Sequence, residues 1–276
     1  MEAVDILVRS LSKPVPMGTG RRMLQYHGRS DRHSKLACWG ILFDLLRSSS
    51  VLRSQVESGE VVFGVNHTMK SYAPEKSKKL DLVLCRPEFE QVPSPRAQTL
   101  ESLAEHYGVE LTPEQERMLK ELPTIYEAPV GNVLVAFEAK ACMTEHVKAL
   151  PRLYDELNSS HQIVHGHSSN ALSVGFAMVN ASETFLSPTN EGKVNTHSQP
   201  RVMQRTIDTL TSLPRRSHHS DQGFDGFAIV VVDMTNDGTP CELVTTPPAP
   251  QPRDVLHYDR MLQRVAHEFD SRFSRR

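Results

Sequence analysis

Three residues near the middle of the chain, Glu138-Ala139-Lys140, follow an apolar run at 133–137 and could hold a metal ion or transfer protons. An apolar run of this kind predicts a strand that is covered on both faces. A carboxylate and an ammonium at the end of such a strand are costly unless they pair or hold a metal ion. Because side chains alternate along a strand, Glu138 and Lys140 point to the same face.

A second apolar segment, residues 80–85, predicts another buried strand and carries Asp81. If the two strands are neighbours, Asp81, Glu138 and Lys140 surround one point. Two carboxylates suit Mg²⁺, which prefers few carboxylates and keeps several waters. A metal ion lowers the pKa of a bound water, and a lysine beside it stabilises developing charge. The set therefore predicts Mg²⁺-assisted hydrolysis of a phosphodiester bond.

This arrangement resembles the PD-(D/E)XK nuclease superfamily, which includes many restriction endonucleases and phage-defence nucleases. The family pattern is an acid on one core strand, followed on the next strand by an acid, any residue and a lysine. Asp81 matches the first acid, and Glu138 and Lys140 match the rest. The resemblance covers roughly residues 60–85 and 130–180.

Two features depart from the family pattern. Leu80 stands where the family name has proline, a position that is often degenerate, and 56 residues separate Asp81 from Glu138, which implies an insertion. The tripeptide by itself is not specific, because the chain contains a second Glu-x-Lys at 191–193. That second copy lies in a polar segment typical of a turn, whereas Glu138 follows an apolar strand.

The resemblance implies an α/β fold with a restriction-endonuclease-like core, in which helices flank a mixed central sheet of about five strands. We expect a single domain over residues 1–276, with a helical insertion at 96–127 whose role is open and a C-terminal helix at 254–273. Periodicity and capping residues predict further helices at 4–11, 35–47 (capped by Ser34), 144–158 and 201–213, and further strands at 61–66, 172–179 and 227–233.

The resemblance also implies roles for the site residues. Asp81 and Glu138 would hold Mg²⁺, with Mn²⁺ as a substitute and the Ala139 carbonyl as a further ligand. Lys140 would orient or deprotonate the attacking water. Members of the family often add an acid from the first helix. Asp44 is the only acid in the predicted helix 35–47, although a solvated polar residue is the simpler explanation for it.

The activity implied is endonucleolytic cleavage of double-stranded DNA, in restriction or phage defence. Cutting both strands usually needs two active sites, so a homodimer is expected. Two alternatives stay open. One is a DNA-binding or assembly module on the same fold that does not cleave DNA. The other is an unrelated α/β enzyme in which Glu138 and Lys140 form a structural ion pair.

Two basic segments are candidates for contact with DNA phosphates, although the formal net charge of the chain is −2. One is the predicted loop at 67–79, immediately before Asp81, and the other is a Pro/Gly-rich stretch at 13–22. Ordinary solvated charge explains each segment equally well. The residues concerned are Lys76, Lys78, Lys79, Arg21 and Arg22.

Composition predicts a globular protein of the cytoplasm. Of the 276 residues, 38% are hydrophobic and 23% charged, which is ordinary for a globular domain. No apolar run approaches the roughly 20 residues of a membrane span, and the first residues lack a signal-peptide pattern. The four cysteines are widely spaced, which favours reduced thiols over a disulfide framework or a zinc site.

Histidines gather in two places, at 161–167 (His161, His165 and His167) and at His218-His219. A zinc site needs convergent Cys or His ligands, and neither group has a cysteine nearby. We therefore interpret both groups as loop histidines beside a nucleic-acid site.

Overall fold

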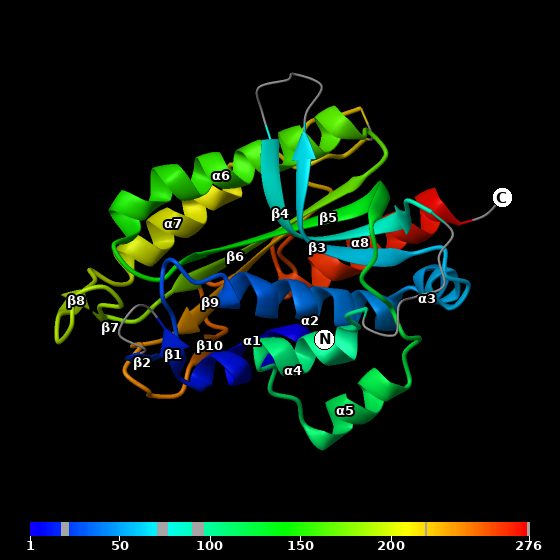
Figure 1. The fold of residues 1–276 in the computed structure, drawn as a ribbon. Helices are drawn as coiled ribbons and strands as arrows, with labels where there is room; N and C mark the ends of the chain where they lie inside the picture. Colours follow the sequence, from blue (N-terminus) through cyan, green and yellow to red (C-terminus); the bar gives the residue numbers. More distant parts are fainter. Residues whose placement is uncertain (18–21, 71–76, 90–96, 219, 275–276) are drawn as a thin grey trace.

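The chain builds a mixed six-stranded sheet with helices on both faces (Figure 1). The computed structural model describes residues 1–17, 22–70, 77–89, 97–218 and 220–274. The strands of the sheet, in spatial order, are β10 (Glu242–Val244), β9 (Gly226–Asp233), β6 (Leu172–Asn180), β5 (Val130–Cys142), β4 (Ser77–Pro87) and β3 (Val62–Lys70). The predicted α/β architecture with a mixed central sheet is confirmed, with one strand more than expected because β10 adds to an edge.

The sheet divides into an antiparallel part and a parallel part. Strands β3, β4 and β5 pair antiparallel, and the first two form a hairpin that contains the strands predicted at 61–66 and 80–85. Strands β5, β6 and β9 pair parallel. Parallel neighbours require crossover connections, and helices α6 (His146–His167) and α7 (Arg201–Thr211) lie in these connections.

One face of the sheet is covered by α1 (Ala3–Ser12), α2 (Arg32–Ser48) and α8 (Tyr258–Phe273), and the other by α6 and α7 (Figure 1). Helix α3 (Ser50–Glu57) follows α2. Two small two-stranded sheets that the sequence pattern did not predict lie outside the central sheet. They are β1 (Val15–Met17) with β2 (Arg22–Leu24), and β7 (Thr184–Leu186) with β8 (Val194–Thr196).

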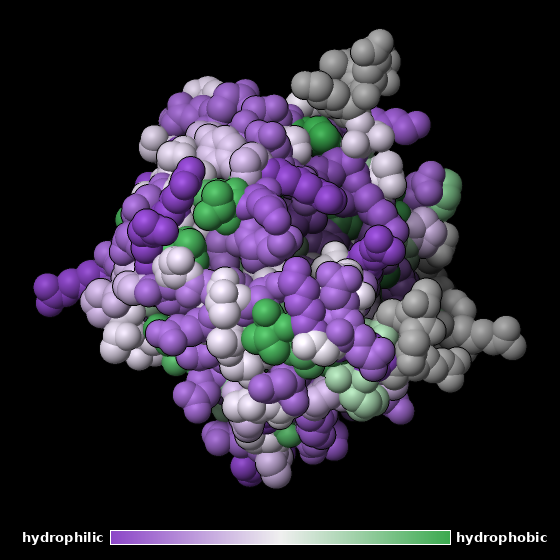
Figure 2. All heavy atoms as spheres, turned by 90° about the vertical axis from the view of Figure 1, so that its left-hand side faces the viewer, coloured by the Kyte–Doolittle hydropathy of each residue, from purple (hydrophilic) through white to green (hydrophobic). Residues whose placement is uncertain are grey.

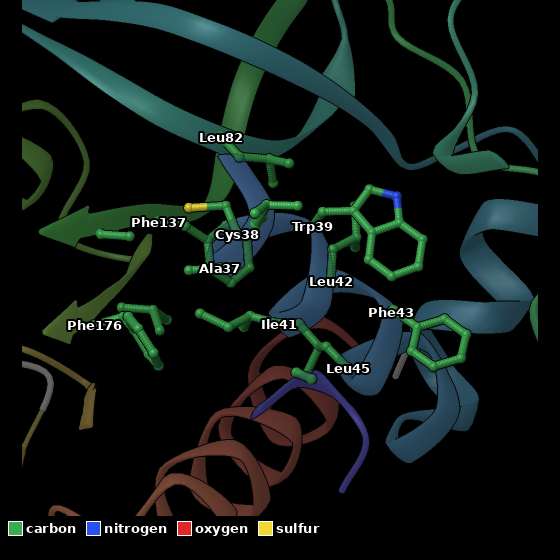
Figure 3. Close-up of a cluster of buried hydrophobic side chains, with 14 of the residues drawn as sticks. Ala37, Cys38, Trp39, Ile41, Leu42, Phe43, Leu45, Leu82, Phe137 and Phe176 are labelled. Atoms are coloured by element: carbon green, nitrogen blue, oxygen red, sulfur yellow. The ribbon is translucent and has the colours of Figure 1, made fainter. Parts of the chain in front are cut away.

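Helix α2 is the centre of the larger core. Its side chains pack against Leu82, Phe137 and Phe176 of the sheet on one side (Figure 3). On the other side Trp39 is fully buried and its indole N–H donates to the Leu100 carbonyl at 2.8 Å. An all-round apolar helix is stable only when neighbours cover every side, and α1, α4 (Leu100–Tyr107) and α8 supply that cover. Each large side chain buried here contributes about 1.5–3 kcal/mol.

The predicted insertion packs against this helix. It contains α4 (Leu100–Tyr107) and α5 (Pro113–Lys120), and the second opens with Thr112 as cap and Pro113 in the first turn. Partly buried apolar residues of both helices contact the core around α2. Arg9 donates from α1 to the Gln115 side chain at 2.8 Å. The insertion therefore completes the hydrophobic core on the side of α2 that faces away from the sheet.

Several predicted boundaries are wrong, because tertiary pairing extends the elements. Strand β5 runs on to Cys142 because β6 pairs with it from Val135 onward, so Glu138 lies inside the strand and not at its end. Most of the predicted loop 67–79 is strand, because β3 and β4 stay paired as far as Lys70 and Ser77.

The helix boundaries also differ. Helix α6 continues past the predicted end at 158 as far as His167, so His161, His165 and His167 lie on a helix and not in a loop. Helix α2 begins at Arg32, which places Ser34 in its first turn and not at its cap. The C-terminal helix begins at Tyr258, later than the predicted start at 254.

All four cysteines are buried and form no disulfide bonds. Burial raises the pKa of the Cys85 thiol to about 12, so it stays protonated at neutral pH. Within the described parts of the chain, no helix combines the length and the apolarity that a membrane span needs.

Asp44, considered as an extra site acid, has a structural role. Its fully buried carboxylate accepts hydrogen bonds from the Glu2 and Ala3 amides at 3.1 and 2.9 Å. Asp44 thus provides acceptors for backbone N–H groups at the start of α1, which have no partner within the helix. It also accepts from the Tyr258 hydroxyl at 3.1 Å. Asp44 therefore joins α1, α2 and α8, and it does not line the pocket that contains Asp81.

We predict that Asp44→Ala lowers the free energy of unfolding by about 2–4 kcal/mol, because it removes a helix cap and leaves buried donors unpaired. Urea denaturation followed by circular dichroism measures the change. Asp5→Ala, an exposed substitution in the first turn of α1, is the control. A loss under about 0.5 kcal/mol, as for ordinary surface substitutions, would contradict the structural role.

Candidate functional site

The Glu138-Ala139-Lys140 tripeptide lies where two strands of the sheet separate. The paired register of β4 and β5 extends as far as Leu82 opposite Phe137. Beyond that pair β4 stays with β3, and the hairpin rises away from the sheet (Figure 1). Asp81 is the first residue past the separation, so its side chain can reach backbone groups of β5 that no longer pair with β4.

Asp81 fills the gap between the separating strands. Its Oδ2 accepts a hydrogen bond from the Ala139 amide at 3.0 Å, and its Oδ1 accepts from the Ser34 hydroxyl of α2 at 3.0 Å. The Ala139 nitrogen belongs to the peptide bond that follows Glu138, so the Asp81 carboxylate contacts the backbone next to Glu138. Each oxygen of Asp81 has a second lone pair beside the one that accepts this hydrogen bond.

The backbone at Asp81 is held by a buried lysine. Lys35 of α2 donates to the Asp81 carbonyl at 3.1 Å and to the Asn66 side-chain oxygen at 2.7 Å. Asn66 adopts a left-handed backbone conformation with φ of 55°, which asparagine tolerates better than most residues. Lys35 thus ties α2, β3 and β4 together directly behind Asp81.

Glu138 is a buried carboxylate, with 2% of its surface exposed. Its Oε1 lies 2.8 Å from Lys140 Nζ and 3.3 Å from Lys78 Nζ. Its Oε2 is buried and has no hydrogen-bond partner among the described residues. Burial raises the pKa of Glu138, while Lys140 and Lys78 act in the opposite direction. Glu138 itself does not line the pocket that contains Asp81 and Lys140.

Lys140 lies between two carboxylates at the surface of the site. In addition to Glu138, it approaches Glu156 Oε2 of α6 at 3.7 Å. Burial alone lowers the pKa of Lys140, but Glu138 and Asp81 outweigh it and the pKa is raised overall. The side chain is therefore an ammonium at neutral pH, which suits charge stabilisation better than removal of a proton from water.

Lys78 does not have the solvated position expected for a phosphate contact. It lies on β4, pairs with Glu138 and donates to the Glu156 carbonyl of α6. Its side chain is 13% exposed, and burial lowers its pKa against the opposing effect of Glu138. Lys78 is therefore a second cation on the buried carboxylate. The sequence did not indicate this role, because the pattern at 67–79 is typical of a loop.

The other residues expected to contact phosphate are scattered. Lys79 is exposed on β4, next to Lys78 in sequence. Arg22, on β2, directs its guanidinium to the Ser187 carbonyl at 3.3 Å and does not line the pocket around Asp81. Lys76 and Arg21 lie outside the described residues.

A pocket of about 550 Å³ opens above Asp81 and Lys140. The start of α2 and the residues just before it form one wall, including Arg29, and the first turns of α6 form the other. Figure 2 shows the surface on this side of the molecule, which is largely hydrophilic. The pocket lies between the start of α2 and the first turns of α6. The size fits a nucleotide-sized group.

Several residues that line this pocket were not predicted from the sequence. Lys148, Arg152 and Glu156 follow one another at four-residue spacing along α6, which the helical face of 144–158 could have indicated. Burial lowers the pKa of His33 to about 4, so this ring is neutral at pH 7. Nothing in the local sequence distinguishes His33, because only the fold brings it to Asp81 and Lys140.

The residues present fit a small divalent cation. Asp81 has spare lone pairs, and Glu138 has a buried oxygen with no hydrogen-bond partner in the described part of the chain. Within the described residues no group of three or more His, Cys, Asp or Glu side chains is arranged to hold a metal ion. Mg²⁺ needs no such cluster, since one or two carboxylates plus waters and substrate oxygens complete its shell.

The second Glu-x-Lys and the histidine groups lie elsewhere. Glu191 and Lys193 are exposed between β7 and β8. His161 packs edge-on against Phe224. His165 lies 3.5 Å from the Asp225 carboxylate, on the opposite end of α6 from the pocket. His219 lies outside the described residues.

No protein-family model matches the chain, and comparison with curated proteins and with solved structures finds no match either.

We predict that Lys78 and Lys140 do not contribute independently to the free energy of unfolding, because both compensate the charge of Glu138. Lys78→Met or Lys140→Met alone leaves one ammonium on the carboxylate. The double substitution leaves a buried charge unpaired and should cost about 3–5 kcal/mol of unfolding free energy, more than the sum of the single losses. Urea denaturation at pH 7 in EDTA measures all three variants.

Adding Glu138→Gln to the double variant is the control, and it should restore most of the stability because the amide carries no charge. Two outcomes would contradict this prediction. One is a loss of unfolding free energy in the double variant that equals the sum of the two single losses. The other is no recovery of stability when Glu138→Gln is added.

Proposed function

We propose that this protein is a Mg²⁺-dependent DNA endonuclease of the PD-(D/E)XK type, with a restriction-endonuclease-like core. The observation that carries the proposal is the hydrogen bond from the Ala139 amide to Asp81, beside the Glu138–Lys140 ion pair. These contacts bring the acid of β4 next to the acid-x-lysine sequence of β5. The role implied by the resemblance is restriction or phage defence in the cytoplasm.

The surrounding fold supports the same proposal. The acid lies on β4 and the acid-x-lysine on β5, its antiparallel neighbour. Helix α6 follows the motif directly and packs on the sheet. The 56 residues between the acids include a helical pair that packs beside α2, so the insertion leaves the strands adjacent.

The roles of the residues follow from their positions. Asp81, Glu138 and the Ala139 carbonyl would hold Mg²⁺, which when bound supplies Lewis acidity and lowers the pKa of a coordinated water. Lys140 donates from its ammonium to the phosphate oxygens and stabilises the charge that develops on them. Lys78 and Ser34 position the two acids, through Glu138 Oε1 and Asp81 Oδ1 respectively.

The pocket wall supports an anionic polymer as substrate. Lys148 and Arg152 on α6 are largely exposed, with 79% and 85% of their side chains accessible, and Arg29 lies on the facing wall. Cations along the rim of a site attract phosphates over a distance set by the salt concentration. A homodimer would supply a second site for cutting both strands of a duplex.

We predict that the protein nicks or linearises supercoiled plasmid in Mg²⁺ or Mn²⁺ and not in EDTA. Asp81→Ala, Glu138→Ala and Lys140→Ala should each lower the rate by at least about a hundredfold, because each removes a ligand or the stabilising cation. Gel electrophoresis of plasmid time courses measures the rate. Circular dichroism checks that each variant is folded.

Glu191→Ala is the matched control, since it alters the exposed Glu-x-Lys between β7 and β8. If the wild-type protein binds DNA but cuts none, a binding or assembly module replaces the nuclease proposal. If it neither binds nor cuts DNA, Glu138 and Lys140 form a structural pair in an unrelated enzyme.

We further predict that Lys148→Gln/Arg152→Gln weakens DNA binding and lowers the slope of log affinity against log salt by up to about two, because each cation removed neutralises one phosphate fewer. Fluorescence anisotropy with a labelled duplex in EDTA measures binding without cleavage. Lys79→Gln and Arg22→Gln, measured alongside, test the hairpin and the N-terminal strand as alternative phosphate contacts. If the slope is unchanged in Lys148→Gln/Arg152→Gln and reduced in Lys79→Gln or Arg22→Gln, the phosphate contact lies on the hairpin or the N-terminal strand and not on α6.

A further inference from the structure

A second polar pocket lies at the end of the sheet where β9 begins. It has a volume of about 400 Å³ and shares no lining residue with the pocket above Asp81. Three arginines line it, Arg215 from the segment before β9 and Arg260 and Arg264 from α8. We call this the arginine pocket. Its apolar lining comes from Phe227, Met261 and Val255.

The arginine pocket has no counter-charge facing it within the described residues. The acid in its lining, Asp225, is turned inward, with 1% of its side chain exposed. Its oxygens accept from the Ser173 amide at 2.8 Å and from Arg272 at 2.9 Å. The described residues form no ion pair with Arg215, Arg260 or Arg264.

Helix α8 brings like charges together in this pocket. Arg260, Arg264, Glu268 and Arg272 follow at four-residue spacing, so they form one row on the helix. Glu268, the acid in the row, pairs with Arg272 at 2.9 Å. Arg260 and Arg264 are left as adjacent positive charges, which is unfavourable on a helix. A bound anion would offset this repulsion.

The backbone around the arginine pocket is held in place by a buried network. Arg216, with 2% of its side chain exposed, approaches Asp225 at 3.5 Å and His165 at 2.8 Å. Its amide donates to the Phe224 carbonyl at 2.9 Å, and its own carbonyl accepts from the Arg264 guanidinium. Arg215 and Arg264 are therefore presented by a fixed frame and not by a free surface loop.

We propose that the arginine pocket binds the phosphate of a nucleoside phosphate. Guanidinium groups bind phosphate through paired, charge-assisted hydrogen bonds. The volume lies within the range of small-molecule sites. Val255 is 62% exposed beside the arginines, and an exposed apolar side chain at the mouth suits the base or sugar of such a ligand. The proposal does not depend on the nuclease activity.

Isothermal titration of the full chain with ADP in EDTA tests the site, with inorganic phosphate and a duplex oligonucleotide as separate titrants. We expect ADP to bind more tightly than inorganic phosphate. Arg260→Gln/Arg264→Gln should weaken ADP binding by at least about tenfold, as the loss of a charge-assisted hydrogen bond predicts. Arg205→Gln, an exposed arginine of α7, is the matched control and should bind ADP like the wild type.

Three results would overturn the proposal. The first is no ADP binding at millimolar concentration, and the second is equal ADP affinity in the double variant and the wild type. The third is a double variant that loses only duplex binding, which would make the arginine pocket a contact for the DNA backbone. Equal affinity for ADP and inorganic phosphate would overturn the nucleoside part and leave a simple anion site.

Discussion

The burial of one carboxylate, Glu138, in an apolar sheet is the constraint on which the site depends. A charged group removed from water is destabilising unless cations compensate it. Two lysines on one of its oxygens meet that need, one from β4 and one from β5 itself. Its other oxygen has no partner within the described chain. The fold thus compensates the charge of Glu138 through one oxygen and leaves the other without a donor among the described residues.

The separation of β4 from β5 makes this possible. In a continuous antiparallel pair the Ala139 amide would point to a neighbouring backbone, and the gap would close. The Asp81 side chain takes that amide instead, and α2 holds Asp81 from behind through Ser34 and Lys35. The all-round burial of α2 by the insertion, α1 and α8 therefore also affects the site, because it fixes the helix that holds Asp81.

A second buried polar centre lies at the other end of α6. Asp225 accepts from a backbone amide and pairs with two arginines, and burial together with Arg216 lowers the pKa of the neighbouring His165. Both polar centres use cations from separate elements to hold one buried acid. They differ in what remains unpaired: a carboxylate oxygen at Glu138, which suits a metal ion, and exposed guanidiniums around Asp225, which suit an anion.

The sequence by itself determined the α/β class and the strands that carry Asp81, Glu138 and Lys140, because apolar runs and side-chain alternation are local properties. It could not place Lys78, Glu156 or His33, since their contacts join residues far apart in the chain. It also ended β5 and α6 too early, because pairing with β6 and packing on the sheet extend elements past their local signals. Burial and charge compensation are properties of the assembled fold, so only the tertiary structure decided which lysines face the acid and which acids are merely structural.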